Sequence, residues 1–104
     1  MNNVETVCKY LTGPELLAQL AEEAAELAQA ALKLRRALDG TNWTPRSVKE
    51  CEQGLVEELA DVNTCLTVLD FKMDLDWETA VTMIGKKTAR WAQRLEAVNN
   101  DTAR

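Results

Sequence analysis

The sequence contains no histidine, few aromatic residues and very little glycine or proline. Without histidine, the chain cannot build a histidine-containing zinc site, the carboxylate–histidine ligand set of a di-iron bundle or a catalytic imidazole. Four glycines, two prolines and 5% aromatic residues leave few turn signals and little strand-forming material in 104 residues. Alanine, leucine, glutamate, glutamine, lysine and arginine dominate instead. Because these residues favour helices, the composition predicts an all-α protein.

Cysteine and long apolar runs are also scarce. The three cysteines, Cys8, Cys51 and Cys65, are odd in number and form no Cys-x-x-Cys pair. This spacing predicts reduced thiols rather than a zinc site or a disulfide framework. No stretch reaches the roughly 18 apolar residues that a membrane span needs, and the first residues do not resemble a secretory signal. We therefore expect a cytoplasmic protein without membrane contacts.

The charge balance excludes a further class of partner. Seventeen acidic and twelve basic residues give a net charge of −5. Binding to nucleic acid usually relies on a surplus of lysine and arginine facing the phosphates, so nucleic acid is not an expected partner. In the absence of histidine, any metal ion must be held by oxygen or thiolate ligands.

Capping signals divide the chain into one short and three long helices. The apolar spacing predicts a short helix around residues 4–11, and a capping box at Thr12 and Glu15 opens a second helix that ends at Gly40. The third helix starts at Thr44-Pro45 or at Ser47. The second helix is predicted over about residues 14–39, the third extends from either start to about residue 71, and the last spans about residues 77–98. Residues 99–104 are expected to fray. We expect one domain over residues 1–104, an antiparallel helical bundle completed by oligomerisation.

Two pairs of acidic residues recur on the second and third helices. Glu23 and Glu26 lie in a segment that resembles the one containing Glu58 and Asp61. At about 100° per residue, each pair flanks the leucine-rich stripe of its helix on the same angular side, whereas Glu22 points away. The stripes are Leu16, Leu20, Ala24, Leu27, Ala31, Leu34 and Leu38, and Leu55, Leu59, Val62, Leu66 and Leu69.

The two acidic pairs are also equally far from the loop between their helices. In an antiparallel hairpin, residues equidistant from the loop lie at the same level, so the four carboxylates should converge. Four converging negative charges repel one another and require protons, basic partners or a divalent cation. Oxygen ligands favour Mg²⁺, with Mn²⁺ as a second possibility.

The last predicted helix carries basic residues along one edge of its apolar stripe. The stripe is Val81, Ile84, Thr88, Trp91, Leu95 and Val98, and the basic row is Lys87, Arg90 and Arg94. A solvated basic face is the simpler explanation for this row. Beside a carboxylate-bound metal, however, the row predicts a phosphate contact, since arginine binds phosphate in a bidentate manner and lysine as a point charge. The helical wheel favours Lys87 over Lys86.

The two acidic motifs together resemble the signature of a known family. Glu23-x-x-Glu26 followed by Glu58-x-x-Asp61 is similar to the ExxE…ExxD pattern of the all-α, MazG-like nucleoside triphosphate pyrophosphohydrolases. The resemblance extends from about Pro14 to Leu95. It includes the sequence around each motif and the late lysine and arginine residues.

The resemblance implies an enzyme that hydrolyses nucleoside triphosphates, often noncanonical or deoxy forms, to the monophosphate and pyrophosphate, and so cleans the nucleotide pool. The family's residues correspond here to Glu23, Glu26, Glu58 and Asp61 as catalytic ligands of Mg²⁺. Lys87, Arg90 and Arg94 would bind the substrate's phosphates. Trp43, in the loop, is the best candidate for stacking on the base. The family also implies a homodimer or a dimer of dimers.

Two other classes of function are compatible with the sequence. Apolar stripes with charged edges are ordinary in helical bundles, so the chain can be a non-catalytic oligomerisation module. A module that binds nucleotides without cleaving them is the other alternative. The matched side and level of the two acidic pairs argue against the first of these.

Overall fold

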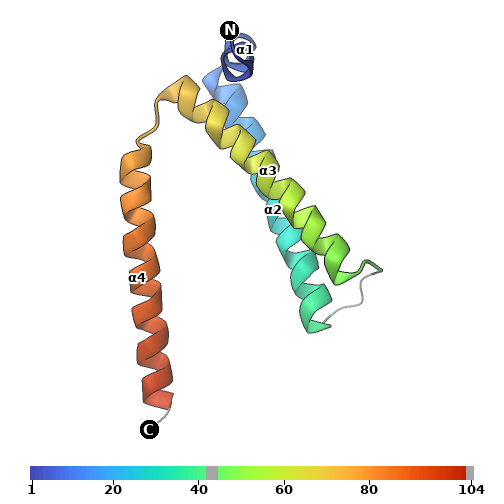
Figure 1. The fold of residues 1–104 in the computed structure, drawn as a ribbon, viewed down its shortest axis with the longest axis vertical. Coiled ribbons are helices and arrows are strands. Elements are labelled where there is room, and N and C mark those ends of the chain that lie inside the picture. Colours follow the sequence, from blue (N-terminus) through green and yellow to red (C-terminus); the bar gives the residue numbers. More distant parts are fainter. Residues whose placement is uncertain (42–44, 103–104) are drawn as a thin grey trace. The chain divides into compact units, whose positions relative to one another are not determined.

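The computed structural model is all-helical and describes residues 1–41 and 45–102, the last two of these by backbone alone. Its helices are α1 (Asn3–Tyr10), α2 (Gly13–Asp39), α3 (Val48–Met73) and α4 (Trp77–Thr102), and the described residues contain no strand (Figure 1). The chain forms two compact units, Met1–Asp74 and Leu75–Arg104. The prediction of an all-α chain with one short and three long helices is confirmed.

Capping explains where the two central helices begin and end. Thr12 accepts a hydrogen bond from the Glu15 N–H at 3.2 Å, and the Glu15 carboxylate accepts one from the Thr12 N–H at 3.1 Å, which completes the predicted capping box. Gly40 ends α2 in a left-handed conformation with φ of 66°, which costs glycine no steric strain. Ser47, the second of the two predicted starts, caps α3 in the same way as Thr12 caps α2.

The fourth helix begins as predicted and ends later. The Asp76 carboxylate accepts a hydrogen bond from the Thr79 N–H at 3.0 Å, so Asp76 caps the first turn. The prediction that residues 99–104 fray was wrong for residues 99–102, which continue α4. The asparagines at positions 99 and 100 have only moderate helix propensity, but neither breaks a helix, and the preceding turns extend through them.

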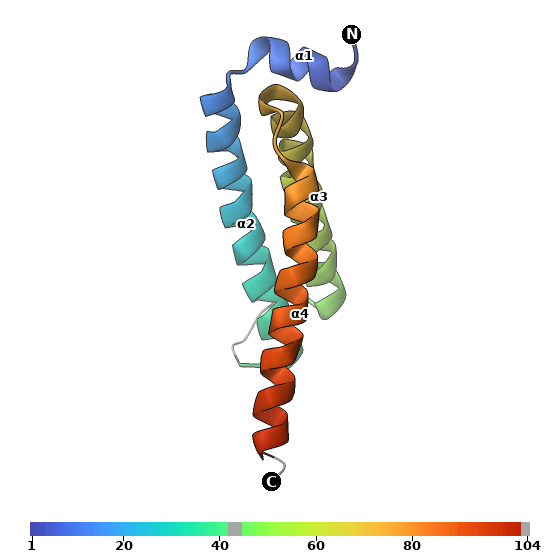
Figure 2. The same ribbon diagram turned by 90° about the vertical axis from the view of Figure 1, so that its left-hand side faces the viewer.

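Helices α2 and α3 form an antiparallel hairpin, and α1 lies across one end of it (Figure 2). The core sits at this end and consists of Cys8 from α1, Leu16 from α2, and Val68 and Leu69 from α3. The Cys8 thiol donates a hydrogen bond to the Val68 carbonyl oxygen at 3.5 Å. The Lys72 ammonium group donates one to the Cys8 carbonyl oxygen at 2.8 Å. These contacts attach α1 to α3.

The contact surface between α2 and α3 is rotated from the predicted leucine stripes. Leu38 and Leu59 are 64% and 42% exposed, although both belong to those stripes. Glu58, the neighbour of Leu59, is half-buried instead, and so is Glu23, whose neighbour Ala24 in the α2 stripe is exposed. The wheel placed these glutamates only at the edge of each stripe, because it located the interface by leucine content alone. The interface therefore lies closer to the carboxylates than the sequence indicated.

The apolar stripe of α4 lies at the surface of its unit. Val81, Ile84, Trp91, Leu95 and Val98 are each more than half exposed. A single helix has no second element on which to pack such a stripe.

Across the described residues, no helix has the length and apolar character that crossing a membrane requires.

Candidate metal-binding site

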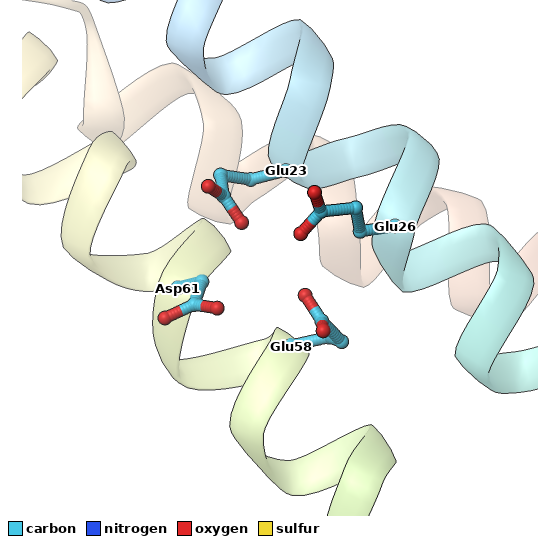
Figure 3. Close-up of side chains that lie close together, drawn as sticks. All are labelled: Glu23, Glu26, Glu58 and Asp61. Atoms are coloured by element: carbon cyan, nitrogen blue, oxygen red, sulfur yellow. The ribbon is translucent and has the colours of Figure 1, made fainter.

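Four carboxylates meet between α2 and α3 near the middle of the hairpin. Glu23 and Glu26 extend from α2, and Glu58 and Asp61 extend from α3, with their side chains directed toward a shared space (Figure 3). One oxygen from each of the four lies within 4.8 Å of the other three. This spacing allows a single cation to contact all four side chains. The predicted convergence of the two acidic pairs is confirmed.

The register of the hairpin produces this convergence. Glu23 and Asp61 are equally far along the chain from position 42, which lies between the two helices, and so are Glu26 and Glu58. Leu16 and Val68 form another such pair, two helical turns away in the core. Leu16 and Glu23 are seven positions apart, and at 3.6 residues per turn this spacing returns to nearly the same face of the helix. The carboxylates therefore lie on the faces that pack apolar side chains at the α1 end.

Two oxygens of the cluster are buried without a partner. Glu23 Oε2 and Glu58 Oε2 are inaccessible to solvent and accept no hydrogen bond. No lysine or arginine among the described residues forms an ion pair with the four carboxylates. A buried carboxylate oxygen without a donor loses the hydration it has in water. Negatively charged oxygen atoms are the ligands that Mg²⁺ and Mn²⁺ prefer, and all four side chains supply them.

The surroundings of Glu23 shift its protonation equilibrium. Loss of hydration raises the pKa of Glu23 above its ordinary value, and the charges of Glu26 and Asp61 raise it further. A hydrogen bond from the Gln19 amide acts in the opposite direction. Cys65, one turn beyond Asp61, also has a raised pKa, because of its partial burial and then the charges of Glu23 and Asp61. The cluster thus disfavours further negative charge.

The remaining predicted site residues lie on other parts of the chain. Lys87, Arg90 and Arg94 are exposed on α4, where spacings of three and four residues place them on one side of the helix. Trp43 lies outside the described residues. Their predicted roles in phosphate and base binding remain predictions.

Two neighbours of the cluster were missed by the sequence analysis. Gln19 lies four residues before Glu23, and Cys65 lies four residues after Asp61. The i, i+4 spacing that joins side chains on one helix face was the available signal for both. The sequence pattern considered only carboxylates as metal ligands, so it included neither glutamine nor cysteine.

The resemblance to pyrophosphohydrolases rests on the motifs of this chain. Comparisons of the chain with models of protein families, with curated proteins and with solved structures gave no match.

The raised pKa of Glu23 predicts a distinctive pH dependence in the metal-free protein. A carboxyl group with a higher pKa in the folded state binds its proton more tightly there, so its ionisation lowers stability as the pH rises through the folded pKa. We expect Glu23→Gln to raise the melting temperature in EDTA at pH 7. The gain should shrink toward pH 4, where wild-type Glu23 is itself largely neutral.

The matched control is Glu22→Gln, one residue earlier on α2, at an exposed position. Its effect on the melting temperature should be small and should not follow the same pH dependence. A Glu23→Gln effect that is equal at both pH values would show that the ionised side chain does not destabilise the fold.

Proposed function

We propose that the chain is an Mg²⁺-dependent nucleoside triphosphate pyrophosphohydrolase of the MazG-like type, acting on noncanonical or deoxy nucleoside triphosphates. The single observation that carries this proposal is the convergence of Glu23, Glu26, Glu58 and Asp61, whose ligand oxygens lie within 4.8 Å of one another. The buried, unpartnered oxygens of Glu23 and Glu58 fit the removal of ligand hydration by a bound cation. The two motifs, on consecutive helices, resemble the ExxE…ExxD pattern of that family.

In this proposal the four carboxylates hold the cation through oxygen ligands from both helices. Bound Mg²⁺ would supply charge neutralisation of the triphosphate and a water of lowered pKa for attack at phosphorus. The pairing of α2 and α3 keeps the ligand oxygens of the four carboxylates within 4.8 Å of one another. Lys87, Arg90 and Arg94 would bind phosphate oxygens, and Trp43 would stack on the base.

Turnover and metal linkage together test the proposal. A panel of canonical and damaged nucleoside triphosphates, assayed for pyrophosphate release with Mg²⁺ and with EDTA, should reveal a metal-dependent substrate. Excess Mg²⁺ or Mn²⁺ should raise the melting temperature, since only the folded state presents the complete site. Amide substitution at Glu23, Glu26, Glu58 or Asp61 should remove the metal-induced shift without unfolding the chain. It should lower turnover by about 100-fold or more.

Glu22→Gln and Glu57→Gln provide the controls, because these exposed glutamates adjoin Glu23 and Glu58 in sequence but are not among the four converging carboxylates. Both control variants should keep the metal-induced rise in melting temperature and the wild-type turnover rate. A metal-induced shift that survives all four cluster substitutions would place the metal elsewhere. Metal binding without pyrophosphate release from any substrate would favour a nucleotide-binding module.

The phosphate contacts have their own test. Lys87→Ala or Arg90→Ala should lower kcat/KM about 10- to 200-fold at saturating Mg²⁺, which is the effect of losing one charged hydrogen bond. Lys86→Ala is the matched control and should retain normal activity, because Lys86 points away from the row. If Lys86→Ala is impaired and Lys87→Ala is normal, the helical register of the phosphate contact is wrong.

We also propose that the chain self-associates through the apolar stripe of α4. Five large apolar side chains on this helix are more than half exposed in their unit, namely Val81, Ile84, Trp91, Leu95 and Val98. Trp91 and Leu95 also line a shallow apolar hollow with Thr88 and Ala92. Exposed apolar surface of this extent commonly marks a contact with another chain, and a second copy is the simplest partner.

Sedimentation velocity at micromolar concentration should therefore show a dimer or a larger assembly. Trp91→Glu should shift the distribution toward the monomer, because it places a charge in the apolar contact. Lys86→Glu introduces the same side chain on the same helix outside the stripe and should leave the assembly intact. A wild-type monomer with normal stability would overturn the proposed self-association.

A further inference from the structure

One side chain outside the four carboxylates is bonded to the candidate metal site. The Gln19 amide, through Nε2, donates a hydrogen bond to Glu23 Oε1 at 2.9 Å. Gln19 lies one turn before Glu23 on α2, so both side chains share one side of the helix. Among the described residues, this is the only side-chain N–H that bonds to one of the four carboxylates.

The bond divides the two oxygens of Glu23 between different environments. Oε1 receives the amide, whereas Oε2 is buried without a hydrogen-bond partner. A donor that holds one oxygen restricts rotation of the carboxylate about its terminal bond. In metal sites, hydrogen bonds of this kind orient the ligands, and their loss weakens metal binding although the donor never touches the metal.

We infer that Gln19 is a positioning residue of the metal site, holding the Glu23 carboxylate through Oε1 so that Oε2 remains available to a divalent cation. The inference rests on the proposed metal-binding function. Gln19 would not contact the cation or the substrate. It would act through Glu23, by reducing the rotational freedom that metal binding must otherwise remove.

A purely structural role for the same bond has a different consequence. Side-chain pairs at i, i+4 stabilise helices slightly whether or not a metal is present. Such a role would change the melting temperature of the metal-free protein and leave the affinity for metal unchanged. Metal affinity is therefore the measurement that separates the two roles.

The first experiment measures Mn²⁺ affinity, from the electron paramagnetic resonance signal of free Mn²⁺, in the 104-residue chain. Gln19→Met keeps an unbranched side chain of similar length and removes the donor. We expect this variant to raise the Kd for Mn²⁺ about 10-fold. Gln29→Met makes the same change at an exposed position ten residues later on α2 and should leave the Kd within about two-fold of wild type.

The outcomes distinguish this inference from the proposed function. A wild-type protein that fails to bind Mn²⁺ would overturn the metal site itself and this inference with it. A wild-type protein that binds Mn²⁺ with the same Kd as Gln19→Met would overturn the role of Gln19 alone. A change confined to the melting temperature in EDTA would likewise reduce the bond to helix stabilisation.

A second measurement observes the bond directly. The side-chain amide of Gln19 gives its own nitrogen–proton signals in a magnetic resonance spectrum, and diamagnetic Mg²⁺ leaves these signals sharp. Titration with Mg²⁺ should shift the Gln19 signals, because the oxygen that accepts its proton belongs to a ligand of the cation. The Gln29 amide signals should not move. Gln19 signals that stay fixed while Mg²⁺ binds would overturn the inference.

Discussion

The antiparallel pairing of α2 and α3 is the constraint on which the other features of the first unit depend. Its register aligns Leu16 with Val68 in the core and Glu23 with Asp61 in the cluster. Both levels use the same helix faces, since they are two turns apart. A register shift by one residue would turn these faces away from each other, so the fit of the apolar end also fixes the distances within the acidic site. Core packing and ligand geometry are thus specified by a single interface.

The composition of this interface changes along its length. The α1 end is closed by buried apolar side chains, whereas the middle contains four negatively charged groups, two of which have a buried oxygen without a partner. Charge at a helix interface opposes folding, so the apolar end must stabilise the hairpin against it. Local sequence and global fold disagree in this way mostly at functional sites. The disagreement is confined here to one level of the hairpin and supports the proposal that this level binds a cation.

Much of this arrangement was predictable from the sequence because its signals are local. Thr12, Gly40 and Ser47 predicted helix boundaries through capping, and the positions of the acidic pairs predicted their convergence. The rotation of the interface was not predictable, because exposure of Leu38 and Leu59 depends on how two helices fit rather than on either alone. The hydrogen bond from Gln19 depends on one rotamer, which spacing permits but does not require. The relation of Lys87 and Arg90 to the carboxylates is a matter of tertiary arrangement, which neither motif nor periodicity encodes.

The three cysteines occupy different levels of this hairpin. Cys8 is buried against the apolar end, Cys51 is buried in the first turn of α3, and Cys65 lies near the carboxylates, where its surroundings raise its pKa. The thiolate is the form that attacks an alkylating reagent, so burial and a raised pKa both slow the reaction. The chain therefore contains its own chemical probes of local opening. The order in which these thiols react with iodoacetamide would report which part of the hairpin separates first, without any introduced label.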